Sequence, residues 1–274
     1  MYTYLKTKDY FLTQEEFELK YDSEFEMLIT HPQPNNLSKY YQSTNYISHT
    51  DDNDTLIDKL YHYIKKYSLR KKIQLINTLD VPKKTILDIG AGTGDFLLEA
   101  SKQNWLTNGV EPNEQARTKA HSKKIPLETS LTKIQNKQHV ITLWHVLEHL
   151  PKLEQQIIDI TNLLESGGYL IIAVPNYKSH DAKKYKTHWA AYDTPRHLWH
   201  FSSTSISLLF EPKGYTLKNT LPMYFDSFYV SLLSEKYRHG KAKYMNAFFT
   251  GLYSNIKATF NGQYSSLIYI LKKD

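Results

Sequence analysis

Apolar residues in the middle of the chain follow two alternating patterns, which are short continuous runs and helical repeats. The short runs are typical of buried strands and cover residues 85–89, 106–110, 140–144 and 169–174. The helical repeats lie between them, over residues 93–103, 113–122 and 152–164. Strands separated by helices of this length indicate parallel β-α-β units. We therefore predict an α/β fold with a doubly wound, mostly parallel sheet and helices on both faces.

The ends of the chain follow other patterns, which divide it into three parts. Alternating aromatic and polar residues predict a small hairpin-like module over residues 1–54. A helical repeat then predicts a linking helix within residues 55–82. The third part, residues 83–274, contains the alternating strands and helices.

Two insertions interrupt this third part. The first, at residues 176–200, is polar and aromatic, and the second, at 223–260, is mostly helical. A final strand is expected near residues 266–271. We expect the apolar residues Phe228 and Phe248 of the second insertion to pack in the core.

Composition adds constraints on function. The 274 residues include 34 basic and 28 acidic ones, a formal net charge of +6, but only four of the basic residues are Arg. This drift toward Lys makes the charge weak evidence for nucleic-acid binding, whereas each Arg becomes more informative, because Lys cannot form bidentate pairs. The absence of Cys excludes disulfides and thiolate metal sites. No secretory signal and no apolar stretch of about 18 residues is visible, so we expect a cytoplasmic protein without a membrane span.

The strongest chemical signal is a glycine-rich turn between the first strand of the third part and its helix. Gly90, Gly92 and Gly94 are spaced GxGxG, and Asp95 stands where a dinucleotide-binding turn would have its third glycine. The carboxylates of Asp88 and Asp95 disfavour a pyrophosphate and suit a ligand with a positive charge. Glu111 ends the second strand, where an acidic residue accepts hydrogen bonds from ribose hydroxyls. A nucleoside cofactor without a pyrophosphate, such as S-adenosylmethionine, fits both features.

Four segments in order, DIGAGTGDF, VEP, ITLWHVLEHL and LLESGGYLIIAVPN, resemble the successive motifs of class I S-adenosylmethionine-dependent methyltransferases. The branch that includes the ubiquinone O-methyltransferases is the most similar. The resemblance covers roughly residues 83–222 and implies a Rossmann-like fold. The third strand departs from the family, because no Asp stands just before Ser130 to make the contact to adenine N6 that the family implies. Motifs and resemblance together predict a cofactor site of Asp88, Gly90, Ala91, Gly92, Gly94, Asp95, Phe96, Glu111, Pro112, Ser130, Leu131, Leu143, Trp144 and His145.

The N-terminal module resembles a zinc-ribbon-like hairpin that precedes this domain in some relatives. Those relatives carry a Cys-x-x-Cys pair where this chain has residues 21–24, Tyr-Asp-Ser-Glu. We therefore predict a degenerate hairpin held by packing, without a metal. Tyr46 and His49 follow it, and two interpretations stay open: they cover the cofactor, or they pack the module on the domain.

Two histidine patterns also raise the question of a metal. His145, Glu148 and His149 match the HxxEH pattern of inverse zinc proteases, but the match begins at a strand end within the methyltransferase motifs. His197 and His200 form a second pair, with no carboxylate cluster beside it in the sequence. We predict no metal at either place.

The first insertion should lie over the carboxyl edge of the sheet, where ligands bind in such folds. One interpretation is an acceptor pocket with stacking aromatic residues, an anion or carbonyl contact from Arg196, and His197 or His200 as a base. The other is an aromatic plug in which Asp193 and Arg196 pair and hold the loop. The candidate catalytic residues are His145, Tyr192, Arg196, His197 and His200.

The predicted reaction is methyl transfer to an N, O or C nucleophile of a small metabolite. An RNA base, such as a tRNA anticodon nucleotide, is a second candidate, because the chain has Lys pairs at 123–124 and 183–184 and a basic stretch at 236–243. A protein that binds S-adenosylmethionine without catalysis is a third. We expect no binding of DNA.

Overall fold

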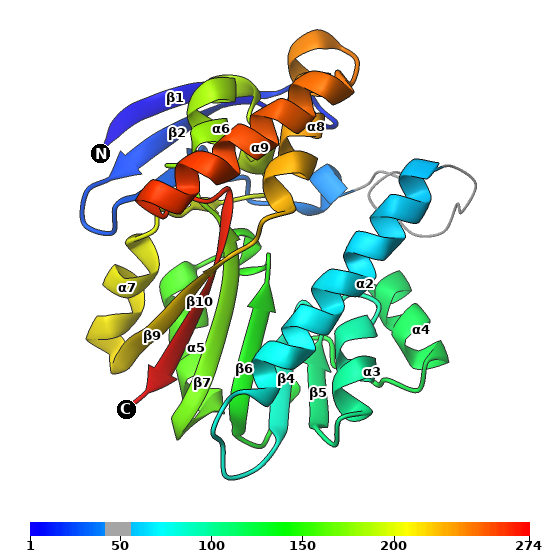
Figure 1. Cartoon of the computed structure of the whole chain (residues 1–274). Helices are drawn as coiled ribbons and strands as arrows, with labels where there is room; N and C mark the ends of the chain where they lie inside the picture. Colours follow the sequence, from blue (N-terminus) through cyan, green and yellow to red (C-terminus); the bar gives the residue numbers. More distant parts are fainter. Residues whose placement is uncertain (42–55) are drawn as a thin grey trace.

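The computed structural model describes residues 1–41 and 56–274, and its centre is a six-stranded sheet of order β5-β4-β6-β7-β10-β9 (Figure 1). Strands β5, β4, β6 and β7 run parallel to one another, and β10 is antiparallel to both β7 and β9. The strands are β4 (Thr85–Ile89), β5 (Leu106–Val110), β6 (Gln138–Trp144), β7 (Leu164–Pro175), β9 (Tyr215–Pro222) and β10 (Ser266–Lys273). The predicted doubly wound, mostly parallel sheet is confirmed.

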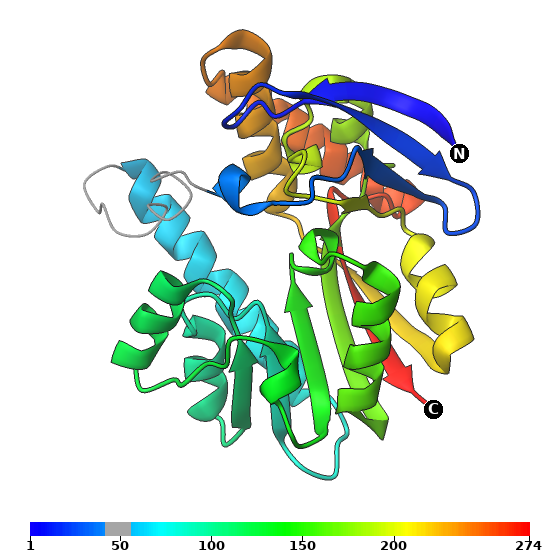
Figure 2. The same cartoon turned by 180° about the vertical axis from the view of Figure 1, so that it is seen from behind.

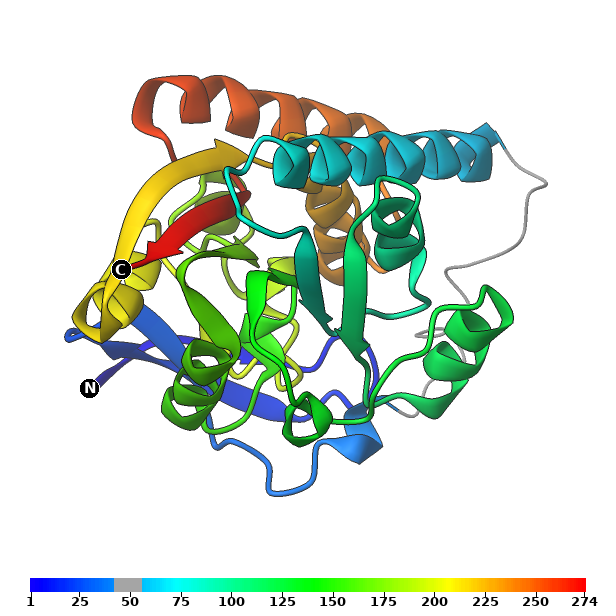
Figure 3. The same cartoon turned by 90° about the horizontal axis from the view of Figure 1, so that it is seen from below.

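Helices cover both faces of the sheet, because β4, β6 and β7 carry apolar side chains on both sides. One face packs against α2 (Leu56–Asn77) and α3 (Asp95–Ser101), which bury Ile76 and Leu97. The other packs against α5 (Leu153–Leu163) and α7 (Ser205–Phe210) through residues such as Ile157. Figure 3 shows α2 and α5 on opposite sides of the strands. Helix α4 (Glu114–Ser122) follows β5.

The N-terminal strands pair with the first insertion. Strands β1 (Tyr2–Lys8), β2 (Glu16–Asp22) and β3 (Met27–His31) are antiparallel, and β3 also pairs with β8 (Trp199–His200). Figure 2 shows this second sheet across the carboxyl end of β6, the bright green strand. The first 41 residues therefore lie over the edge of the central sheet where ligands bind in such folds.

The second insertion forms two helices, α8 (Asp226–His239) and α9 (Tyr244–Asn261), and α9 packs on α8 and on α6 (His180–Tyr185). The expectation that Phe248 belongs to the core is wrong, because its side chain is 52% exposed on the outer face of α9. None of the described helices is long and apolar enough to cross a membrane.

Candidate active site

The glycine-rich turn begins where β4 ends. The backbone N–H groups of Gly90 and Ala91 donate hydrogen bonds to the carbonyl oxygen of Val110, at 2.8 and 3.0 Å, which ties the turn to the end of β5. A Cβ atom on Gly90 would lie only 2.5 Å from Cγ2 of Val146, whereas one on Gly92 would meet no described atom within 4 Å. The turn is therefore tightly packed at Gly90 and open at Gly92, where a ligand can approach the backbone.

Glu111 lies beside this open position. Its carboxylate accepts hydrogen bonds from the backbone N–H groups of Gly92 and Asn113, both at 2.9 Å. Two backbone donors fix the carboxylate, and its other lone pairs can still accept hydrogen bonds from two hydroxyls. A parallel bridge between Val110 and Glu128 extends this edge of the sheet. It leads directly to Ser130 and Leu131, the residues expected near adenine.

The two aspartates of the glycine-rich motif interact with side chains of the protein itself, Asp88 with Thr142 and Asp95 with two lysines. Asp88 is buried, and this burial raises its pKa to about 7, although Thr142 Oγ1 donates it a hydrogen bond at 2.6 Å. Burial would also raise the pKa of Asp95, but hydrogen bonds from Lys123 and Lys65 hold it below its usual range. The expectation that both carboxylates offer free negative charge to the ligand is therefore corrected.

The end of β6 contributes Trp144, whose half-buried ring meets Phe96 edge-on at a centroid distance of 5.7 Å. Lys72 of α2 places its Nζ 4.3 Å from the centre of the same ring. Burial lowers the pKa of Lys72 to about 8, although Asp88 and Asp226 act in the opposite direction. Sequence reasoning missed Lys72, because nothing in a helical repeat marks which lysine will turn inward.

Of four other predicted cofactor residues, the structure describes Leu143 and Pro112. The side chain of Leu143 is fully buried in the core, so only its backbone can approach a ligand. Pro112 is exposed beside Glu111. Tyr46 and His49 lie outside the described residues, and the two interpretations of their role stay predictions.

His145 follows Trp144 and adopts a left-handed backbone conformation, with φ of 57°. Its Nε2 lies 3.1 Å from Asp226 Oδ2 of α8, and its Nδ1 lies 3.4 Å from Glu148 Oε1. Burial alone would lower the pKa of His145, but the two carboxylates raise it to about 10. The residues of the HxxEH pattern do not share a continuous α-helix, because Leu147–His149 form a single 3₁₀ turn.

A cavity of about 410 Å³ opens at the carboxyl ends of β6 and β7. The loop after β6 lines it with His145 and Glu148, and helix α8 lines it with an acidic residue, aromatic rings and aliphatic side chains. The full lining is Phe11, His145, Glu148, Pro175, Ala190, Ala191, Asp193, His197, Asp226, Tyr229, Val230, Leu233, Tyr237 and Ser266. A larger groove of about 610 Å³ lies on β1 and β2, away from the glycine-rich turn. The first insertion therefore does reach a cavity at the predicted edge.

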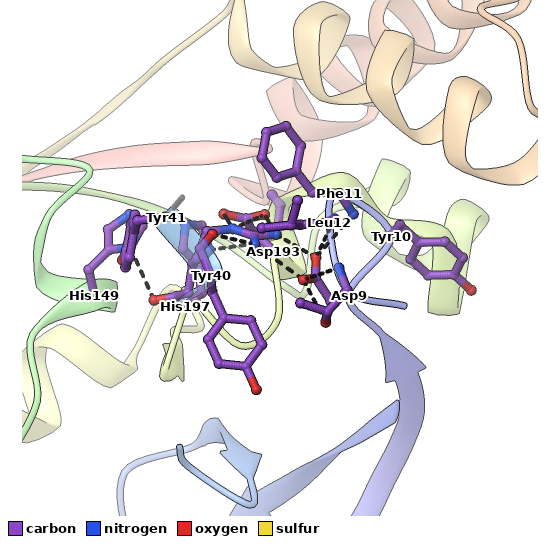
Figure 4. A network of polar contacts seen from close by, with 12 residues as sticks. Asp9, Tyr10, Phe11, Leu12, Tyr40, Tyr41, His149, Asp193 and His197 are labelled. Carbon is purple, nitrogen blue, oxygen red and sulfur yellow. Dashed lines mark hydrogen bonds and ion pairs between the residues drawn. The ribbon is translucent and has the colours of Figure 1, made fainter. Parts of the chain in front are cut away.

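Arg196 does not face that cavity as a ligand-binding group. Its side chain is 1% exposed, and its guanidinium binds Asp9 Oδ1 at 2.8 Å and Asp193 Oδ1 at 2.7 Å, with the Tyr40 carbonyl at 3.1 Å (Figure 4). The ring of Phe11 lies 4.9 Å from the guanidinium carbon. The structure favours the second interpretation of the insertion, in which the Asp193–Arg196 pair holds the loop, and it adds Asp9 from the N-terminal module.

The remaining candidates of the insertion divide into two groups. Tyr192 is buried against Trp189, with ring centroids 4.9 Å apart, and burial raises its pKa well above the usual range. His200 is also buried, and its Nε2 lies 2.9 Å from Thr30 Oγ1. These two side chains are packing residues here, which corrects their assignment as catalytic residues. His197 alone among the predicted bases of the insertion lines the cavity.

Comparison with known proteins agrees with this geometry. A sequence family described as a methyltransferase domain matches residues 61–219, which is more than half of the chain. The chain belongs to this methyltransferase family. It is an S-adenosylmethionine-dependent methyltransferase, and S-adenosylmethionine is its cofactor. No curated protein matches the sequence.

Solved structures share the fold of this methyltransferase. The magnesium protoporphyrin IX methyltransferase of Synechocystis PCC 6803, with bound SAH, has a TM-score of 0.57 and 14% identity, over 86% of this chain and 97% of the other. The cyclopropane synthase MmaA2 of Mycobacterium tuberculosis has a TM-score of 0.55 and 12% identity, over 89% and 100% of the two chains. The class I fold expected from the sequence motifs is confirmed.

Proposed function

We propose that the enzyme transfers the methyl group to an N, O or C nucleophile of a small molecule bound in the 410 Å³ cavity. The cavity and the glycine-rich turn lie at neighbouring strand ends of the sheet, which carries this proposal. Ile89 of β4 pairs with Leu143 of β6, so Gly90 and Trp144 begin adjacent loops, and the loop after Trp144 lines the cavity. A volume of this size suits a small molecule.

In this arrangement the protein's main task is to align the acceptor with the methyl carbon and the sulfur. The acceptor's lone pair forms the new bond to carbon, and the carbon–sulfur electron pair stays on sulfur as the sulfonium becomes a thioether. An N–H or O–H acceptor also loses a proton. His197 lines the cavity and is placed to accept it.

The charges of the cavity favour a small molecule over RNA. The three carboxylates of its lining, Glu148, Asp193 and Asp226, outnumber their cationic partners His145 and Arg196, and a net negative charge repels the phosphates of a nucleic acid. The rings of Trp189 and Tyr192 in the first insertion are buried, so an RNA base cannot stack on them. The open cavity also supports catalysis over mere cofactor binding. The two solved structures compared above carry names of small-molecule chemistry, a magnesium protoporphyrin IX methyltransferase and a cyclopropane synthase.

A matched pair of variants on α8 tests this proposal. Leu233 lines the cavity, and Leu232 is a neighbour that does not. The Leu233→Trp variant should lower kcat/KM for methyl transfer about tenfold or more and leave the affinity for S-adenosylmethionine unchanged, whereas Leu232→Trp should change neither. Equal activity in both variants, or methyl transfer found mainly in an RNA fraction, would show that the acceptor binds elsewhere.

A further inference from the structure

One cluster next to the cavity brings together two histidines and a carboxylate that are separated in the sequence. Glu148, His149 and His197 each offer one ligand atom, and these atoms lie within 4.8 Å of one another. Glu148 and His149 belong to the 3₁₀ turn after β6, and His197 belongs to the first insertion. The backbone N–H of Leu198 donates a hydrogen bond to the carbonyl of Glu148 at 2.8 Å, which fixes the two segments side by side.

The carboxylate of Glu148 lacks the partners that a buried charge requires. The residue is 1% exposed, and no group of the described residues donates a hydrogen bond to either carboxylate oxygen. The nearest charged group is His145, whose Nδ1 lies 3.4 Å from Oε1 and whose Nε2, on the other side of the ring, contacts Asp226. Buried charges in proteins are normally paired and hydrogen-bonded, or they coordinate a metal.

Both imidazoles are oriented by backbone carbonyls. The Nδ1 of His149 lies 3.1 Å from the carbonyl oxygen of Arg196, and the Nδ1 of His197 lies 2.9 Å from that of Ala191. The Tyr41 hydroxyl also lies 3.1 Å from the first nitrogen. Because a carbonyl only accepts, each Nδ1 carries the hydrogen and each Nε2 presents a lone pair. A histidine that binds a metal typically donates its other N–H to a carbonyl in this way.

We propose that Glu148, His149 and His197 bind a divalent transition-metal cation, such as Zn²⁺, Co²⁺ or Fe²⁺. Two imidazoles and one carboxylate are a common ligand set for such ions and leave coordination positions open. Ligand distances near 2.1 Å place the donor atoms about 3–4 Å apart, so the separations between donor atoms must shorten by at most about 2 Å.

The open positions of such an ion face the cavity, because Glu148 and His197 line it. An acceptor oxygen coordinated there would lose its proton more readily, and with the ion bound His197 would act as a ligand and not as the base. This use of the ion rests on the proposed function, whereas the binding of the ion does not. The sequence alone predicts no metal here, because in the sequence His197 stands close to His200 and far from Glu148.

The test is a titration of the full-length chain, stripped of metal with a chelator, with Co²⁺ followed by absorption and with Zn²⁺ by competition. We expect saturable binding of one ion per chain. The Glu148→Gln and His197→Gln variants should each weaken it about tenfold or more, and His188→Gln, which alters a histidine outside the cluster, should not change it. Zn²⁺ should also raise the Tm of the unmodified chain, and it should raise that of Glu148→Gln by less at the same Zn²⁺ concentration.

Glu148→Gln has nearly the same shape as the native side chain and removes a poorly paired charge, so it should fold and be at least as stable without metal. No saturable binding of Co²⁺ or Zn²⁺ would overturn the proposal. Binding that both cluster variants retain would place the ion on surface histidines and would also overturn it. Methyl transfer by the metal-free enzyme, measured in parallel, reports on the proposed function separately.

Discussion

Substitutions of single glycines by alanine separate packing from cofactor contact at the turn after β4. Gly90 has a φ of 72°, and its Cβ would lie 2.5 Å from Val146 Cγ2. The left-handed conformation costs about 1–2 kcal/mol for alanine, and the overpacking adds about 1–3 kcal/mol. Gly92, with φ of 54°, pays only the conformational cost, because no described atom lies within 4 Å of its Cβ. Gly214, with φ of 83° and equally open, is a matched control distant from the turn in the sequence.

Urea unfolding and calorimetric titration with S-adenosylmethionine measure the two effects. Gly90→Ala should lose more free energy of unfolding than the other two variants. Gly92→Ala and Gly214→Ala should lose similar amounts, but only Gly92→Ala should weaken cofactor binding, by about tenfold or 1.4 kcal/mol. Equal stability losses at Gly90 and Gly214 would refute the contact with Val146. Unchanged affinity in Gly92→Ala would refute the approach of the cofactor to Gly92.

Two buried charges give further predictions. The pKa of Asp88 is about 7 in the folded chain, above its ordinary value of 3.8. Between these two pH values the folded chain retains a proton that the unfolded chain releases. The free energy of unfolding therefore falls as the pH rises from 3.8 to about 7. Asp88→Asn, which keeps an oxygen for the Thr142 hydroxyl, should match the native protein near pH 4 and exceed its stability by up to about 4 kcal/mol above pH 7; a difference independent of pH in urea unfolding would contradict this. Arg196→Leu leaves Asp9 and Asp193 without their cation and should cost about 3–5 kcal/mol, and a loss below about 1 kcal/mol would show that the triad does not hold the loop.

The sequence was sufficient for the central sheet. Short apolar runs such as residues 85–89 and 140–144 are typical of strands buried on both faces, and the glycine-rich turn and Glu111 stand at the ends of such runs. The segment between α4 and β6 was harder to predict, because it forms no full strand. Its pairing with the edge of the sheet is the single bridge between Val110 and Glu128.

The acceptor side of the site depends on contacts between distant segments. Arg196 was noticed for its rarity, but its partner Asp9 is 187 residues away in the sequence, so the choice between ligand contact and loop anchor required the fold. His197 was paired with His200, whose ring centroid lies 6.4 Å away, but His197 is closer to His149, with ring centroids 4.5 Å apart, and also meets Glu148. Phe11 and Asp226 line the cavity and carry no motif that marks them.

Labelled methyl transfer from S-adenosylmethionine tests the central claim most directly. The enzyme and its Leu233→Trp variant are incubated with small-molecule and RNA fractions of the native cell. We predict label in the small-molecule fraction with the native enzyme and little or none with Leu233→Trp. Label in RNA, or equal labelling of small molecules by both proteins, would contradict an acceptor bound in the cavity between β6, β7 and α8.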